Sequence, residues 1–172
     1  INDNGAHDVF LFAGGDYRFS HCTFANYSAM HQAPSIRMSN YYEDVNGNEQ
    51  LRPMERADFE NSIIYGKIES EIGIEESENT TFNYKFNNCL IKLKESDYDI
   101  SNTTHFSNNI FNENPEFIQN MEFFEYNYEL DTLSAAQNSA ASNIALQFEY
   151  DLNGNYRFTD GSPDIGAYER IE

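Results

Sequence analysis

The sequence predicts an all-β fold, a solenoid of short stacked strands, and three observations favour it. The 172 residues include 14 Phe and 12 Tyr, large apolar side chains that disordered chains lack, so a single packed domain is expected. Short β-rich runs are separated by Asn, Asp, Gly and Ser, and helical periodicity is almost missing. A short motif also recurs at variable spacing, which stacked coils tolerate because their outer loops can lengthen.

The recurring motif consists of Phe, any residue, Asn or His, a small residue, any residue, and then Ile or Phe. Its four copies cover residues 17–24, 57–64, 84–91 and 104–111. Successive Phe positions are 40, 27 and 20 residues apart (59 − 19, 86 − 59, 106 − 86). Four unrelated amphipathic strands of a β-sandwich are the alternative interpretation.

The Asn or His of the motif is expected at a sharp bend. The Phe and the last apolar residue are five positions apart, so unbroken strand alternation would place them on opposite faces. Asn tolerates the left-handed conformation that would break this alternation. Stacking would then place Asn61, Asn88 and Asn108 in one column, with His21 in the same position of the first copy and amide hydrogen bonds along the stack. The chain contains 22 Asn in all.

The motif divides the chain into two parts of one structural domain. Residues 1–118 are expected to form the stacked coils, with an excursion near residues 40–53. Residues 119–172 are expected to cap the last coil, because an open coil leaves backbone groups unpaired. In this cap, the Ala-rich segment 133–146 is suited to a short helix and Asn153-Gly154 predicts a hairpin. The chain opens on Ile1 in strand-like sequence, and we interpret it as a processed or excised piece of a longer protein.

The charge of the chain limits its partners. There are 10 Lys and Arg against 29 Asp and Glu, a net charge of −19. This disfavours binding to nucleic acid or to an anionic membrane surface, because both need clustered cationic side chains. No run approaches the ~20 apolar residues of a membrane span. An acidic polymer is also repelled unless cations intervene, so a neutral glycan is the more suitable carbohydrate partner.

Three segments carry a family resemblance. Residues 21–27, residues 61–66 and the ending Pro163-Asp164-Ile165-Gly166-Ala167-Tyr168-Glu169 resemble right-handed parallel β-helix proteins, the pectate-lyase-like solenoids. Within that group the chain is similar to bacterial surface proteins with a choice-of-anchor carboxy-terminal region. The resemblance covers most of the chain from Val9 onward, and the sequence departs from the usual ending at residues 140–143. It implies a right-handed single-stranded parallel β-helix on the cell surface of, or secreted by, a Gram-negative bacterium.

A small set of residues is suited to binding. Tyr41 and Tyr42 can stack on sugar rings, Glu69 and Glu71 lie in a dense acidic segment, and Lys92 shares one strand face with a second lysine. We predict a non-catalytic module that presents these residues to a glycan or a surface protein, or that serves as a spacer. The alternative is a polysaccharide lyase or glycoside hydrolase with catalytic residues here or in upstream coils. No catalytic residue is assigned, because the separation of the carboxylates in space decides that chemistry.

Neither a cofactor nor a metal position is assigned. Segments 44–48 and 151–155 alternate hard oxygen ligands, but Gly stands fourth where an EF-hand loop needs it sixth, so both are expected to be tight turns. Bound Ca²⁺ is compatible with so acidic a chain.

Cys22 and Cys89 share one motif position and lie two coils apart. Their Cα atoms are then expected roughly 9 to 10 Å apart, beyond the ~7 Å limit for a disulfide bridge. Both are expected to be free, buried thiols.

Overall fold

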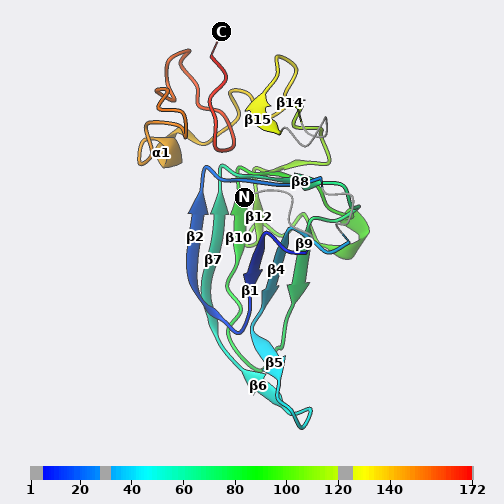
Figure 1. The fold of residues 1–172 in the computed structure, drawn as a ribbon. Coiled ribbons are helices and arrows are strands. Elements are labelled where there is room, and N and C mark those ends of the chain that lie inside the picture. Colours follow the sequence, from blue (N-terminus) through cyan, green and yellow to red (C-terminus); the bar gives the residue numbers. More distant parts are fainter. Residues whose placement is uncertain (1–5, 28–31, 120–125, 172) are drawn as a thin grey trace.

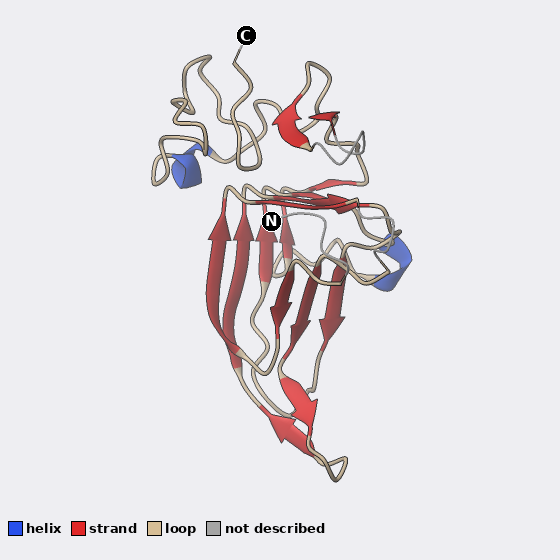
Figure 2. Cartoon of the chain, in the orientation of Figure 1, coloured by secondary structure: helices blue, strands red, loops and turns tan. Residues whose placement is uncertain are grey.

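The computed structural model describes residues 6–27, 32–119 and 126–171. Strands dominate it, and the two helices of this part of the chain are short (Figure 2). The first parallel sheet contains β2 (Gly15–Ser20), β7 (Met54–Glu60), β10 (Lys85–Asn87) and β12 (Phe106–Ser107). The second contains β3 (Thr23–Asn26), β8 (Ile63–Gly66), β11 (Leu90–Ile91) and β13 (Ile110–Phe111). The third contains β1 (Val9–Leu11), β4 (Ile36–Ser39) and β9 (Ile72–Glu75).

The remaining elements are antiparallel pairs and short helices. Strands β5 (Tyr41–Glu43) and β6 (Glu49–Leu51) form a hairpin that extends away from the three sheets (Figure 1). Strands β14 (Phe117–Gln119) and β15 (Asn127–Leu130) pair in the carboxy-terminal part. The helices are η1 (Glu95–Asp97), of the 3-10 type, and α1 (Ser142–Ala145), which lies in the Ala-rich segment expected to be helical.

Each copy of the motif supplies one strand to the first sheet and one to the second, because the chain bends between them. The residue at the bend has a positive φ in every copy: 51° at His21, 46° at Asn61, 52° at Asn88 and 54° at Asn108. Left-handed backbone of this kind has the lowest conformational energy cost for Gly and Asn. The bend lets the Phe and the last apolar residue of each copy approach the same interior.

The sequence predicts a right-handed single-stranded parallel β-helix, a pectate-lyase-like solenoid. The sheet topology contradicts this prediction. The strands form separate short parallel sheets and two antiparallel pairs rather than one continuous solenoid. The third sheet has only three strands, and after β11 the chain turns into η1 instead of adding a fourth. The repeat shortens to 20 residues between the last two motif Phe positions, which leaves too few residues for a complete further turn.

A column of aromatic rings fills the interior beside the first sheet. Parallel pairing places Phe19, Phe59, Phe86 and Phe106 in register. Successive ring centroids are 4.9, 4.9 and 5.5 Å apart, and the rings lie within 14° of parallel. Phe59 and Phe86 are fully buried. Buried side chains of the second and third sheets complete this core: Leu11, Ile36, Met38, Ile64, Ile72 and Ile91.

The carboxy-terminal segment, residues 126–171, packs on the outer face of the second sheet (Figure 1). A second buried cluster joins the segment to this sheet, and it consists of Ala25, Tyr27, Ile63, Leu90, Phe117, Leu130, Ala136 and Ile165. Backbone contacts anchor the segment to the first two motif copies, since Gly166 N donates to Asn61 O and Ala167 N donates to Thr23 Oγ1. The segment therefore lies over the face of this sheet instead of across the end of the stack. Among the described residues, no helix is long and apolar enough to cross a membrane.

Replacing Asn88 by leucine is expected to lower the free energy of unfolding by about 1–2 kcal/mol, because a branched side chain must adopt left-handed backbone there. Chemical denaturation of the two proteins measures the difference. Asn88→Gly is the matched control, because glycine keeps the positive φ at little steric cost. Equal stability of the leucine variant and the natural chain would contradict the proposed role of the bend.

Candidate functional site

A row of exposed aromatic rings lies on the outer side of the third sheet. Alternation along β1 turns Leu11 into the core and leaves Phe10 and Phe12 outward, 47% and 52% exposed. Hairpin β5–β6 follows β4 directly and brings Tyr42 to the same place. The ring centroids are 5.4 Å apart from Phe10 to Phe12 and 5.5 Å from Phe12 to Tyr42. Three aromatic faces thus follow one another along the surface.

Cationic and polar groups border these rings. The Arg37 guanidinium lies 5.2 Å from the Phe10 centroid and forms an ion pair with Glu75. Arg52 lies 5.2 Å from the Tyr42 centroid and donates to its hydroxyl at 3.1 Å. These contacts favour the observed positions of the Phe10 and Tyr42 rings, because cation–π attraction opposes rotation of either ring into solvent.

The rings and their border form a shallow cavity of about 270 Å³, which we call the aromatic groove. It is lined by Phe10, Phe12, Arg37, Ser39, Tyr41, Tyr42, Glu43 and Glu75. Four aromatic rings line it, and the other lining side chains supply hydroxyl, guanidinium and carboxylate groups. This combination accommodates a ligand that has both apolar faces and many hydrogen-bonding groups.

The other predicted binding residues lie away from the aromatic groove. Glu71 is fully buried, and its carboxylate accepts hydrogen bonds from Ser35 Oγ at 2.6 Å and from the backbone N of Ile68 at 3.1 Å. Lys92 donates to Gly66 O at 2.7 Å, and its ammonium lies over the ring of Tyr65. Glu69 is exposed, with Lys94 at 3.9 Å. The structure therefore places Tyr41 and Tyr42 in the aromatic groove. Glu69, Glu71 and Lys92 lie outside it, although Glu71 N donates to Lys92 O at 2.9 Å.

Within the predicted bend column, side chains connect His21 to Asn61. Ala141 N donates to Asn61 Oδ1 at 2.8 Å and Ala141 O accepts from Asn61 Nδ2 at 3.0 Å, which fixes the orientation of the amide. Nδ2 also lies 3.0 Å from His21 Nε2, which must then accept. Burial, with the charge of Arg157, lowers the pKa of His21 to about 3, so this imidazole is neutral. In the described part of the chain, no side-chain hydrogen bond joins Asn88 to Asn61 or Asn108.

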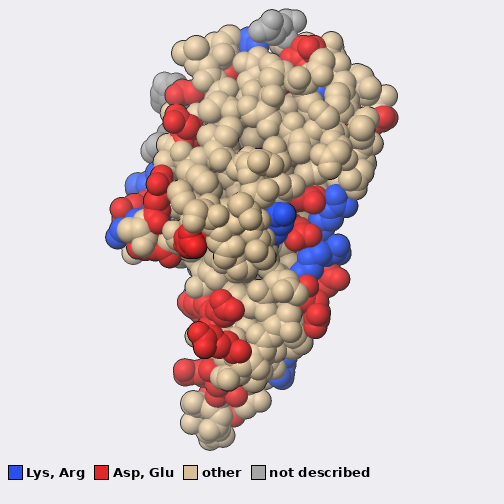
Figure 3. Space-filling view, turned by 180° about the vertical axis from the view of Figure 1, so that it is seen from behind, with Lys and Arg blue, Asp and Glu red and all other residues tan. Residues whose placement is uncertain are grey.

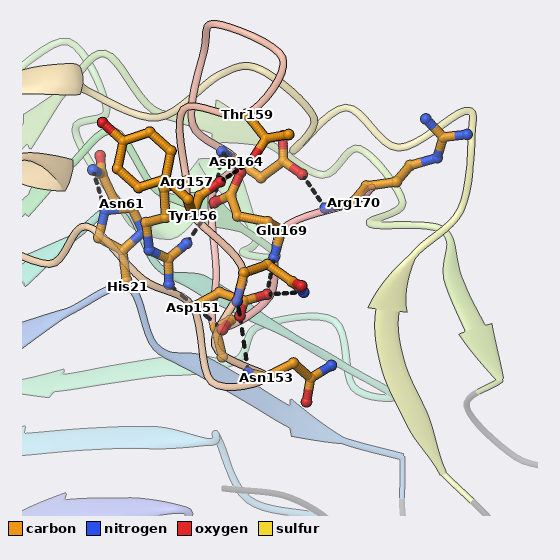
Figure 4. Close-up of polar contacts among 12 residues, drawn as sticks. His21, Asn61, Asp151, Asn153, Tyr156, Arg157, Thr159, Asp164, Glu169 and Arg170 are labelled. Carbon is orange, nitrogen blue, oxygen red and sulfur yellow. Dashed lines mark hydrogen bonds and ion pairs between the residues drawn. The ribbon is translucent and has the colours of Figure 1, made fainter. Parts of the chain in front are cut away.

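A buried network of charges, which was not foreseen from the sequence, holds the carboxy-terminal segment together (Figure 4). Arg157 Nη1 lies 2.6 Å from Glu169 Oε1, and both side chains are 3% exposed. Asp164 N donates to both Glu169 oxygens at 3.1 Å. Asp164 itself accepts from the backbone N of Arg170 at 2.8 Å, and Asp151 accepts from the backbone N of Glu169 at 2.8 Å.

The network perturbs the titration of its carboxyl groups. Burial, reinforced by the Asp164 charge, raises the pKa of Glu169 to about 8, and Arg157 opposes this rise. Burial also opposes ionisation of Asp151, but backbone N–H donors, of Glu169 and Asn155 first, hold its pKa below the usual value. Because these groups face one another inside the segment (Figure 4), we assign them to its stability rather than to a reaction.

The thiols and the turns follow the expected chemistry only in part. Cys22 and Cys89 are both free, as their spacing predicts, but only Cys89 is fully buried and Cys22 is partly accessible. Burial raises the pKa of Cys89 to about 12.

In segment 44–48, the Asp44 carboxylate accepts from the backbone N of Asn46 and of Asn48, as in a tight turn. Among the described residues there is no cluster of His, Cys, Asp and Glu suited to a metal ion.

Comparison of the chain with protein-family models, with curated proteins and with solved structures gave no match. The resemblance to choice-of-anchor surface proteins therefore stays a prediction.

Sequence reasoning missed Phe10, Phe12 and Arg37. A signal for the first two is present in Val9-Phe10-Leu11-Phe12, where four apolar residues in succession place apolar groups on both faces of a strand. Leu11 faces the core, and the opposite face, with Phe10 and Phe12, meets solvent. The position of Arg37 over Phe10 depends on pairing between segments 27 residues apart, which the sequence alone does not reveal.

Proposed function

We propose that this chain is a non-catalytic module that binds a neutral glycan in the aromatic groove. The row of Phe10, Phe12 and Tyr42 carries the proposal. The C–H groups of a sugar ring pack on aromatic faces. Their hydrogen atoms carry a partial positive charge, which the negative face of the aromatic ring attracts. The hydroxyl groups of the sugar would then reach Ser39, Arg37 and the carboxylates at the rim.

Charge favours a neutral ligand over an acidic one. Two carboxylates, Glu43 and Glu75, line the aromatic groove, and the whole chain carries a net charge of −19. Arg37 is already paired with Glu75, so its charge is largely neutralised. An acidic polysaccharide would meet a repulsive potential at this surface.

The burial of Glu71 removes this carboxylate from the candidates for contact with a ligand. Among the acidic residues selected from the sequence, Glu71 is enclosed by Ser35 and the backbone of Ile68 and does not reach the aromatic groove. The location on the cell surface or outside the cell, and a surface protein as a second class of partner, stay predictions.

Replacing Phe12 by alanine is expected to weaken binding of a neutral hexasaccharide at least tenfold, because the central ring of the row is lost. Isothermal titration calorimetry with cello-, xylo-, laminari- and mannohexaose measures this change, and tenfold corresponds to about 1.4 kcal/mol. Val45→Ser is the matched control, since Val45 is fully exposed at the hairpin tip and does not line the aromatic groove.

Two binding results would overturn the proposal. The first is equal binding by the Phe12→Ala variant and the natural chain, and the second is absence of binding across the neutral panel. Oligogalacturonate with and without Ca²⁺ tests the charge argument, and tight binding without the cation would contradict it. Release of shortened products from any of these glycans would support the lyase or hydrolase alternative.

A further inference from the structure

Two turns of the chain share almost the same sequence and a similar backbone geometry. Segment 44–48 reads Asp-Val-Asn-Gly-Asn and segment 151–155 reads Asp-Leu-Asn-Gly-Asn. In each, the carboxylate of the first residue accepts from the backbone N of the third and of the fifth residue, at distances between 2.7 and 3.0 Å. The glycine φ is 78° in the first turn and 85° in the second. The chain therefore presents one Asn-Gly pair twice, in comparable turns.

An Asn-Gly pair is chemically labile, since asparagine is one of the thermolabile residue types. The glycine backbone N gives its proton to hydroxide from the solvent and attacks Cγ of the asparagine. The N–Cγ bond forms, the Cγ–Nδ2 bond breaks, and Nδ2 leaves as ammonia after taking a proton from water, which regenerates hydroxide. Water then opens the five-membered imide at either carbonyl carbon. The product is aspartate, or isoaspartate when the bond to the backbone carbonyl carbon breaks.

The two asparagine side chains are held differently. Asn153 Nδ2 donates to Glu129 Oε1 at 2.6 Å. The Asn46 side chain is exposed and makes no hydrogen bond in the part of the chain that the structure describes. The amide of Asn46 can therefore turn toward Gly47 N freely, whereas that of Asn153 must first leave a carboxylate. Breaking a hydrogen bond to a charged group before the reaction slows that reaction by about tenfold or more.

The turn at 151–155 is also anchored to the rest of the carboxy-terminal segment. Leu152 N donates to Ala167 O at 3.0 Å. Asp151 accepts from Glu169 N at 2.8 Å, within the buried network of charges (Figure 4). These contacts oppose any local opening that would bring the Asn-Gly pair into the geometry for attack.

The turn at 44–48 lacks such an anchor among the described residues. It ends hairpin β5–β6, which extends away from the three sheets (Figure 1). Its hydrogen bonds reach no further than Gln50. Gly47 N donates to Asp44 O at 2.9 Å, and this bond must open before Gly47 N can attack. Local opening is favourable here because few contacts cross the turn.

We propose that Asn46 is a site of non-enzymatic modification, which converts it to aspartate and isoaspartate through an imide with Gly47 N. Asn153 is protected by Glu129 and by its anchored turn. The modification changes the net charge from −19 to −20 (−19 − 1). It adds this charge to the lower part of the molecule, where acidic side chains already gather (Figure 3). The modified turn does not line the aromatic groove, so the site is independent of glycan binding.

Incubation of the protein at pH 8.5, followed by peptide mapping with mass spectrometry, measures both reactions in one molecule. Asn46 is expected to react about tenfold or more faster than Asn153, and both aspartate and isoaspartate should form. The chain unfolded in urea is the matched control. The two five-residue sequences differ only at Val45 and Leu152, so the two rates should be nearly equal once the structure is lost.

Two variants test the cause of the difference. Glu129→Ala removes the acceptor of Asn153 and is expected to raise the rate at Asn153 without changing the rate at Asn46. Asn46→Gln is expected to remove the more acidic species that anion-exchange chromatography separates after incubation, because a six-membered ring closes more slowly. Equal rates at the two positions in the folded protein, or the same difference in the unfolded chain, would overturn the proposal. An unchanged rate at Asn153 in the Glu129→Ala variant would also overturn it.

Discussion

Replacing Phe59 by alanine is expected to lower the free energy of unfolding by about 3–5 kcal/mol. Phe59 is fully buried, and its ring is stacked between Phe19 and Phe86, both at 4.9 Å. Truncation removes the contacts of both faces and leaves a cavity that rigid neighbouring strands fill only partly. Urea denaturation followed by far-ultraviolet circular dichroism measures the loss.

Phe10→Ala is the matched control for this prediction. It deletes the same kind of side chain from a position that is 47% exposed on the outer face of β1. The expected loss in the free energy of unfolding is about 0.5 kcal/mol or less, the usual size for surface substitutions. Similar losses for the two variants would show that the stacked column does not dominate the core.

Replacing Arg157 by methionine is expected to lower the free energy of unfolding by about 3–5 kcal/mol at pH 8.5, above the pKa of Glu169, because this carboxyl group then loses its cationic partner and stays buried only by taking up a proton. The two charged atoms are 2.6 Å apart, and both side chains are almost inaccessible. Thermal unfolding at several pH values measures the effect. The double variant Arg157→Met with Glu169→Leu is the control, since removal of both charges avoids an unpaired one and should recover most of the loss.

The loss in the Arg157 variant is also expected to depend on pH. Burial raises the pKa of Glu169 to about 8 from about 4.5 in the unfolded chain. The contribution of this carboxyl group to stability is therefore complete below pH 4.5 and disappears as the pH rises through about 8. Removal of Arg157 raises the pKa further, so the variant should lose less stability at pH 5 than at pH 8.5. A loss that does not change with pH would contradict this assignment.

The local part of the fold could be predicted from the sequence, and the long-range part could not. The motif located the strands on either side of His21, Asn61, Asn88 and Asn108, because left-handed backbone is a property of single residues. The continuity of a solenoid depends on loop lengths and on which segments pair in the third sheet. Those pairings join β1 to β4 and β4 to β9, with other strands between them in the sequence, and no short-range signal specifies them.

The candidate site shows the same division. Tyr41 and Tyr42 were selected from the sequence because tyrosine rings can stack on sugar rings. Their companions Phe10 and Phe12 lie about thirty residues earlier and join them only when β1 pairs with β4. Glu71 looked like part of an acidic surface, but Ser35 and the backbone of Ile68 enclose it. Burial of a carboxylate by distant donors is not encoded in its neighbours along the chain.

The contacts that anchor the carboxy-terminal segment set the order in which the molecule can form. Ala167 reaches Thr23 across 144 residues, and Asn61 reaches Ala141 across 80. Closing such long loops costs conformational entropy before any contact compensates for it, and chains with many distant contacts fold slowly. During synthesis, the outer face of the second sheet, with Ile63 and Leu90, stays uncovered until the carboxy-terminal segment has left the ribosome. Until then this apolar face is available to other molecules, and refolding of the isolated chain should be slow and sensitive to its concentration.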